Sequence, residues 1–252
     1  MGADRHVAES GPAIELEDVR FRWPGAAEDV LAIDSLSISR GERVFMQGAS
    51  GSGKSTLLSV IGAIVDPRRG RVHVDGVPLD SLSGGARDIF RADKIGFIFQ
   101  MFNLLPFLGL VDNVLLPCRF SARRRVRALS HGRSLDAEAR RLLSTLGLDV
   151  DVLADRPVIE LSVGQQQRVA AARALIGSPP VVVADEPTSA LDADARHDFL
   201  ALLFEEVQAV DATLVLVSHD RELAGVFDRV IDLSAINQVH DAVTSARPGM
   251  IR

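Results

Sequence analysis

The stretch Gly48-Ala49-Ser50-Gly51-Ser52-Gly53-Lys54-Ser55-Thr56 fits the pattern G-x-x-x-x-G-K-[ST] and follows a short apolar run, Val44-Phe45-Met46, that is typical of a strand. Three glycines let the backbone curl so that successive N–H groups point at phosphate oxygens, and a helix beginning near Lys54 adds the positive end of its dipole. Lys54 supplies a mobile charge for the β and γ phosphates, and the Ser55 hydroxyl suits a Mg²⁺ that keeps most of its waters. The sequence therefore predicts a nucleotide phosphate site here.

Length and composition limit the class of protein. With 252 residues, 47% hydrophobic and 25% charged, the chain can form one large domain or a core with an inserted lobe. A formal charge of −6 argues against a protein that mainly wraps nucleic acid. The single cysteine, Cys118, excludes an internal disulfide framework, and the N-terminus lacks the apolar core of a signal peptide, so we expect a reducing cytoplasm.

No apolar stretch approaches the ~18 residues that are needed to span a bilayer. A role at a membrane would therefore require docking onto another chain.

The hydrophobic pattern predicts an antiparallel β layer, an α/β core and an inserted helical lobe. Alternation over 14–23 and 30–38 indicates antiparallel strands, whereas the run Val181–Ala184 lacks alternation and indicates a buried parallel strand. From about residue 101 to 165 the apolar residues have helical spacing, which predicts an inserted helical lobe. Further strands are predicted over 71–76, 95–99, 214–217 and 229–233. Helices are predicted over 110–116, 137–146 and 193–209, with an alanine-rich helix that follows Leu161–Arg168 and ends at Ile176 and a short helix after Asp220. We expect a single domain over 13–234, with tails at 1–12 and 235–252.

Two carboxylates follow the buried strand. The strand end would place Asp185 beside Ser55, where it can hold the water shell of a metal ion. Glu186 stands one residue further on and is the candidate general base for a water in line with the γ phosphate. Alone, an Asp-Glu pair after a strand can equally be two solvated acids, but the phosphate loop makes a catalytic role the better interpretation.

Two other polar residues end predicted strands. In a parallel sheet, His219 would reach the same edge as Asp185 and Lys54, where it can position the γ phosphate. Gln100 can complete the Mg²⁺ site with its amide. Because the helical lobe begins beside it, Gln100 can also transmit to that lobe whether the site is occupied. Each is a weak signal alone, because a histidine or glutamine at a strand end is usually structural.

A second anion site is predicted at the start of a helix. Leu161-Ser162-Val163-Gly164-Gln165 offers one hydroxyl and several free N–H groups. The alternative is a serine N-cap with a polar first turn, and local sequence does not separate the two.

Taken together, these motifs resemble the ATP-binding cassette ATPases over roughly residues 14 to 234. They occur in that family's order: the phosphate loop, Gln100, Leu161-Ser162-x-Gly164-Gln165, Asp185-Glu186, Ser189-Ala190-Leu191-Asp192 and His219. The resemblance implies an α/β fold, with a P-loop NTPase (RecA-like) core, an antiparallel β layer and an inserted helical lobe. It also implies ATP and Mg²⁺ as ligands and hydrolysis of ATP to ADP and phosphate.

The resemblance assigns roles to individual residues. Trp23 takes the place of the aromatic that stacks on adenine, where tyrosine is more usual. Ser162, Gly164 and Gln165 would bind ATP held by the phosphate loop of a second copy, and Asp192 would lie in the loop that links the two sites. Val163 departs from the glycine typical of this motif. The expected catalytic residues are Lys54, Gln100, Glu186 and His219, and the expected metal site is Ser55, Gln100 and Asp185.

The branch of the family is indicated by residues after Gln100. Ile95–Pro106, with Asp112-Asn113-Val114, resembles the ATPase subunits of lipoprotein-release and macrolide-export transporters. Against this, Pro187–Asp192 lacks the Gly-Asn usual there and looks like the form common among importers, which ranks second.

We therefore expect a cytoplasmic ATPase subunit that forms an ATP-bound homodimer and drives a separate membrane permease. The alternatives are a soluble cassette protein that acts on ribosomes or DNA and, third, a P-loop kinase. The basic run Arg123–Arg127 is interpreted as a solvated helix face rather than a lipid or partner site, and Cys118 as unreactive.

Overall fold

The computed structural model describes residues 11–153 and 156–239, and their strands form two sheets. One sheet is antiparallel, in the order β2-β1-β4-β5. Ile14 and Leu16 on its central strand are fully buried, and Ile14 lies between Ile38 and Val74. The bounds are β1 Ile14–Phe21, β2 Leu31–Ile38, β4 Arg69–Val74 and β5 Val77–Pro78. This is the antiparallel layer that the alternation predicted.

The second sheet is parallel, in the order β6-β7-β8-β3-β9. Its strands are β3 Arg43–Gln47, β6 Ile95–Ile98, β7 Val181–Asp185, β8 Thr213–Val217 and β9 Arg229–Asp232. All five residues of β8 are buried, because both faces of the strand are covered. The unalternating apolar runs of the sequence are therefore the central strands of this sheet.

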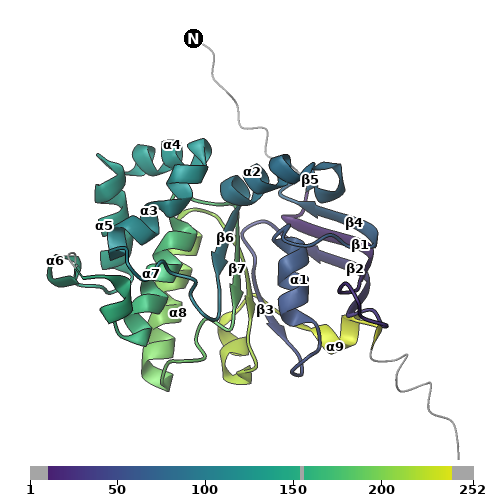
Figure 1. The fold of residues 1–252 in the computed structure, drawn as a ribbon. Helices are drawn as coiled ribbons and strands as arrows, with labels where there is room; N and C mark the ends of the chain where they lie inside the picture. The colour runs from purple at the N-terminus through teal and green to yellow at the C-terminus, as the bar shows by residue number, and fades with distance from the viewer. Residues whose placement is uncertain (1–10, 154–155, 240–252) are drawn as a thin grey trace, which may run out of the picture.

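Each face of the parallel sheet belongs to a different hydrophobic core. Leu214 and Leu216 of β8 face the helical side, whereas Val215 and Val217 face α1 (Lys54–Ile61) and the antiparallel sheet. Figure 1 shows α1 between the two sheets.

The predicted helical lobe lies between β6 and β7, and its helices gather on the far side of the parallel sheet (Figure 1). Leu142 and Leu143 of its amphipathic helix α5 are buried in the helical core. The helices on this side are α3 Leu110–Phe120, α4 Ala122–His131, α5 Leu135–Thr145, α6 Val150–Leu153, the 3₁₀ turn η2 Val158–Glu160, α7 Val163–Leu175 and α8 Ala193–Ala209. The α/β class, the antiparallel layer and the inserted helices are confirmed.

The longest helix that was not predicted is α2 (Gly84–Lys94); the four-residue helices α6 and α9 were not predicted either. The 3₁₀ turn η1 (Leu79–Ser81) and helix α2 (Gly84–Lys94) occupy a stretch to which the sequence pattern assigned no element. The helix begins with two glycines, which are poor helix formers, and buries only Phe90. The two glycines at its start therefore obscured the helix in the sequence.

The basic run was partly misinterpreted. Arg124 is only 2% exposed, and its Nη2 donates to the Ala174 carbonyl oxygen at 2.6 Å. Arg123 and Arg125 are exposed, as predicted. The solvated-face interpretation is wrong for Arg124, because α4 packs with that side against α7. Cys118 is buried, and burial raises the pKa of its thiol.

The described chain continues past residue 234 into the core. After the 3₁₀ turn η3 (Arg221–Val226) and β9, helix α9 (Leu233–Ile236) delivers Asn237, which is buried. The Asn237 side chain accepts from Ala32 N at 2.8 Å and donates to Val30 O at 2.9 Å and Ser52 O at 3.1 Å. The predicted tail boundary at 235 is therefore too early. The other tail assignments, 1–10 and 240–252, lie outside the described residues.

Asn237→Ala should lower the free energy of unfolding by about 1–3 kcal/mol, because it leaves buried main-chain groups of β2 and the phosphate loop without partners. Urea unfolding checks this. Gln238→Ala, next to it and exposed, is the control and should change stability by about 0.5 kcal/mol or less. Equal effects of both changes would contradict the anchoring role of Asn237.

Candidate functional site

The phosphate loop joins β3 to α1. Gly53 caps the helix with φ of 98°, and a Cβ at this position would stand 3.1 Å from the Val30 oxygen, so only glycine fits. The Lys54 ammonium donates to the carbonyl oxygens of Gly48 at 2.8 Å and Ala49 at 2.9 Å. The loop thus places a cation and the N–H groups of a helix start around one cavity, as an anion site requires.

Asp185 ends β7 and accepts a hydrogen bond from the Ser55 side chain. Burial raises the pKa of the Asp185 carboxyl; Ser55 and Lys54 lower it, and neighbouring Glu186 raises it. A partly buried carboxylate in contact with a hydroxyl is an oxygen donor set that fits Mg²⁺. No cluster of three or more His, Cys, Asp or Glu residues suited to a metal occurs in the described part of the chain, so this mixed set is the candidate.

Glu186 and His219 are in direct contact. The His219 Nδ1 lies 3.0 Å from both carboxylate oxygens of Glu186, and the Ser218 hydroxyl donates to Oε2 at 3.1 Å. Glu186 has φ of 48°, a strained value for a residue with a side chain, and its N–H donates to Val217 O. The structure therefore holds this carboxylate in a defined place beside the phosphate loop.

These groups line a single cavity of about 410 Å³. Lys54, Ser55, Gln100, Asp185, Glu186 and His219 all contribute, together with Val30, Ser50, Gly51, Gly53 and Thr56. The structure thus brings together all six residues to which the sequence assigned catalytic or metal roles. Val30 was not predicted, because nothing in an apolar residue before β2 marks it as part of a site.

Trp23 is not among the residues that line this cavity. Its ring stands edge-on to Phe21, with centroids 5.0 Å apart, and is 42% exposed. The exposed indole face is therefore free to stack on a flat ligand.

The predicted second anion site lies outside the cavity of its own chain. Ser162 caps α7 in a capping box: its hydroxyl accepts from Gln165 N at 3.3 Å, and Gln165 Oε1 accepts from Ser162 N at 2.9 Å. The capping interpretation is therefore correct as far as local structure goes. Ser162 and Val163 remain exposed to a second molecule.

The segment that ends at Asp192 runs beside this helix start. Asp192 caps α8 by accepting from Ala195 N at 2.9 Å. A Cβ on Gly164 would stand 3.3 Å from Leu191, so the start of α7, called here the signature helix after its motif Leu161–Gln165, touches this loop.

Arg173 and Asn113 hold the loop after Gln100, and the sequence analysis did not assign this role to either. Phe102 and Asn103 both have positive φ, and their carbonyl oxygens accept from the two terminal nitrogens of Arg173. Buried Asn113 accepts from Leu105 N at 2.8 Å and donates to three carbonyls of the same loop. The sequence marked Asn113 only through its place in Asp112-Asn113-Val114, which did not reveal that it holds this loop.

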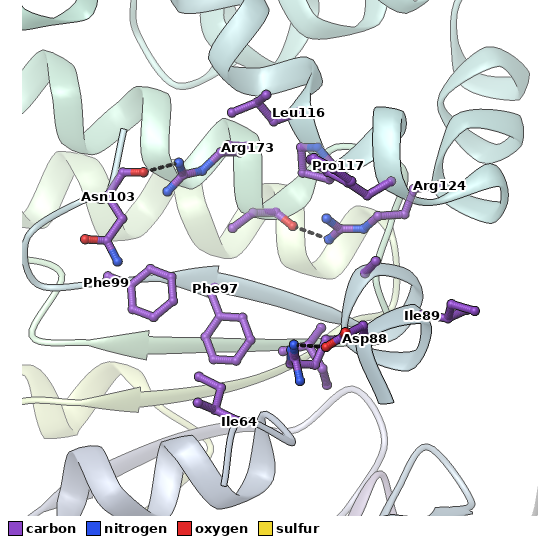
Figure 2. A pocket seen from close by; sticks show the side chains of 15 residues that line it. Ile64, Asp88, Ile89, Phe97, Phe99, Asn103, Leu116, Pro117, Arg124 and Arg173 are labelled. Carbon is purple, nitrogen blue, oxygen red and sulfur yellow. Dashed lines mark hydrogen bonds and ion pairs between the residues drawn. The ribbon is translucent and has the colours of Figure 1, made fainter. Parts of the chain in front are cut away.

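A larger apolar groove, of about 550 Å³, lies next to this loop (Figure 2). It runs between α2, β6, α3, α4 and α7, and Ile89 and Phe120 at its rim are exposed. Phe97 and Phe99 stack in parallel with centroids 5.0 Å apart. The groove also contains Ile64, Asp88, Arg91, Ala92, Ile95, Asn103, Leu116, Pro117, Arg124, Arg173 and Ala174.

Two arginines in this groove lack a carboxylate partner among the described residues. Arg91 is paired with Asp88, but Arg124 and Arg173 donate only to main-chain carbonyls, as the dashed lines of Figure 2 show in part. Burial lowers the pKa of Arg124 to about 10. The groove thus combines apolar walls with two arginines whose guanidinium groups donate to main-chain carbonyls.

No helix in the described residues is long and apolar enough to cross a membrane.

Comparison with known proteins agrees with this geometry. The family model described as ABC transporter matches residues 31–189. The macrolide export ATP-binding/permease protein MacB of Burkholderia pseudomallei is 40% identical over 231 residues, which are 89% of this chain and 33% of that protein. The lipoprotein-releasing system ATP-binding protein LolD of Bordetella pertussis is 39% identical, over 89% of this chain and 94% of the relative. The chain thus spans about a third of MacB but nearly all of LolD.

A solved structure supports the same assignment. The dimeric ATP-binding cassette MJ0796 superposes with a TM-score of 0.74 at 35% identity, covering 87% of this chain and 93% of that one. The same cassette, from Methanocaldococcus jannaschii, is named an uncharacterized ABC transporter ATP-binding protein, and a second structure shows its dimer bound to ADP and Pi. On its motifs, fold and similarity, the chain belongs to the ABC transporter family, as an ATP-binding cassette.

Proposed function

We propose that this chain binds two ATP molecules between two copies of itself, hydrolyses them to ADP and phosphate, and drives a separate membrane permease of the export or lipoprotein-release type. The observation that carries the proposal is the single cavity into which Lys54, Asp185, Glu186 and His219 converge. The branch is supported by the names of the relatives MacB and LolD.

In this mechanism the phosphate loop and Lys54 bind the phosphates of ATP. Ser55, Asp185 and Gln100 would hold Mg²⁺, which when bound neutralises phosphate charge. Glu186 accepts a proton from the attacking water, and His219 with Ser218 holds its carboxylate in place.

The homodimer is proposed because the signature residues are separated from their own chain's cavity. Ser162 and Gly164 lie at an exposed helix start, where the N–H groups of the first turn can meet the γ phosphate held by a second copy. Two identical sites close naturally with two-fold symmetry. The related cassette MJ0796 is dimeric in the two structures described above.

The permease is proposed to dock in the apolar groove beside the Gln100 loop, which places the protein at the inner face of the membrane. A short amphipathic segment with one acidic side chain fits the exposed Ile89 and Phe120 and the unpaired Arg124. The loop held by Arg173 and Asn113 then connects this groove to Gln100 in the ATP cavity. A soluble cassette that acts on ribosomes or DNA remains the alternative, and a partner bound in this groove would then be a ribosomal or DNA-associated protein.

Glu186→Gln should bind ATP but hydrolyse it at least ~100-fold more slowly, because an amide cannot take the proton of the attacking water. Binding free energy of ATP shared between chains becomes association free energy, so the dimer should accumulate. Size-exclusion chromatography of this variant with and without Mg²⁺-free ATP measures the shift. A variant that binds ATP and stays monomeric contradicts the shared site.

Two further variants locate the dimer contact. Ser162→Asp, added to Glu186→Gln, keeps an oxygen that can cap α7 but places a negative charge against the partner's γ phosphate. It should bind ATP and stay monomeric, and a dimer that persists would place the contact elsewhere. Lys54→Ala with Glu186→Gln should show neither tight ATP binding nor dimerisation.

Cysteines engineered at Ile89 or Phe120 should crosslink to a membrane protein in intact cells that contain the whole transport system. The native Cys118 is buried, so background labelling should be low. Val152→Cys is the control, because Val152 is similarly exposed but lies on α6 outside the groove. Mass spectrometry identifies the crosslinked chains. Recovery of ribosomal or DNA-associated proteins alone would support the soluble alternative.

A further inference from the structure

His219 contacts the proposed general base although its own side chain is poorly held. The His219 side chain is 73% exposed, whereas Glu186, its partner at 3.0 Å, is 14% exposed. Packing cannot fix a ring that is mostly in water. Its position must therefore depend on the main chain of residues 218–220.

Ser218 anchors this main chain on one side. It is buried, its N–H donates to Met46 O at 3.3 Å, and its hydroxyl both donates to Glu186 and accepts from Asp220 N at 3.1 Å. The segment is thus tied to the end of β3 and to the carboxylate itself.

Asp220 anchors the other side through an ion pair with Arg196. The two side chains are 22% and 21% exposed, so the pair is shielded from much of the solvent. Asp220 also accepts from Glu222 N at 3.0 Å, which caps η3. Arg196 lies one turn into α8, and its second terminal nitrogen reaches Leu191 O at 3.4 Å.

We infer that Arg196 and Asp220 are positioning residues that hold His219 on Glu186, and so set the rate of ATP hydrolysis without contacting ATP. The inference rests on the proposed function, since it assigns Glu186 as the base. Neither Arg196 nor Asp220 lines the nucleotide cavity. Because Arg196 is bonded to the 188–192 loop as well, the same ion pair ties the catalytic histidine to the segment that touches the signature helix.

The first test is steady-state hydrolysis of Mg-ATP by Arg196→Gln and Asp220→Asn. Asparagine keeps an oxygen for capping η3, so Asp220→Asn removes mainly the ion pair. Each change should lower kcat about 10-fold and leave KM for Mg-ATP within about 2-fold, because misorientation of a catalytic group affects the chemical step. Arg196→Lys, which keeps the charge, should retain about half of kcat or more.

The double variant and a matched control separate positioning from stability. If the two residues act as one unit, Arg196→Gln with Asp220→Asn should lose about the same 10-fold in kcat as either single change. Arg43→Gln removes another partly exposed ion pair, that with Asp228, at the opposite end of β3 from the phosphate loop, and should leave kcat unchanged. Multiplied losses in the double variant, or an equal loss in Arg43→Gln, would overturn the inference.

A second readout does not depend on hydrolysis. The NMR signals of the His219 imidazole, assigned with a His219→Gln variant, should move in Arg196→Gln and Asp220→Asn but not in Arg43→Gln. Unmoved signals would refute the positioning role even if the wild-type protein proved inactive. An inactive wild type whose His219 signals do respond would instead refute the proposed hydrolysis alone.

Discussion

The parallel register of β3, β7 and β8 is the constraint on which the site depends. Met46 and Asp185 both lie level with Val217, on either side of β8. The phosphate loop, the Asp185-Glu186 pair and Ser218-His219 therefore leave the sheet at the same height. Without this register the cation, the carboxylates and the imidazole, which come from three separate segments of the chain, would not share one cavity.

The two faces of the parallel sheet support different parts of the molecule. The face toward α1 and the antiparallel sheet supports the phosphate loop, and Asn237 fastens this side from the far end of the described chain. The other face carries the inserted helices, which display the exposed groove and the start of α7. The Gln100 loop, α8 and η3 all run from the nucleotide edge into the helical side, and Leu223 of η3 is buried there.

Local sequence was a good guide where a residue's role is set by its own main chain. Glycines in the phosphate loop and apolar runs such as Val181–Ala184 predicted the loop and the buried strands correctly. It was a poor guide where neighbours in space decide the role. Nothing in Arg123–Arg127 marks Arg124 as the buried member, because its burial comes from α7. Helix α2 was not predicted for a related reason. Its glycine-rich start has low helix propensity, and the helix is stabilised by packing.

By itself the sequence determined the fold class, the order of the strands and the chemical types at the site, since these follow from hydrophobic period, glycine placement and motif spacing. The tertiary structure alone decided which side chains meet. The contact of Glu186 with His219, the ion pair of Arg196 with Asp220 and the burial of Asn237 join residues that are 33, 24 and up to 207 positions apart. The physical reason is that hydrogen bonds and ion pairs act over a few ångströms, so they depend on how strands and helices pack and not on local pattern.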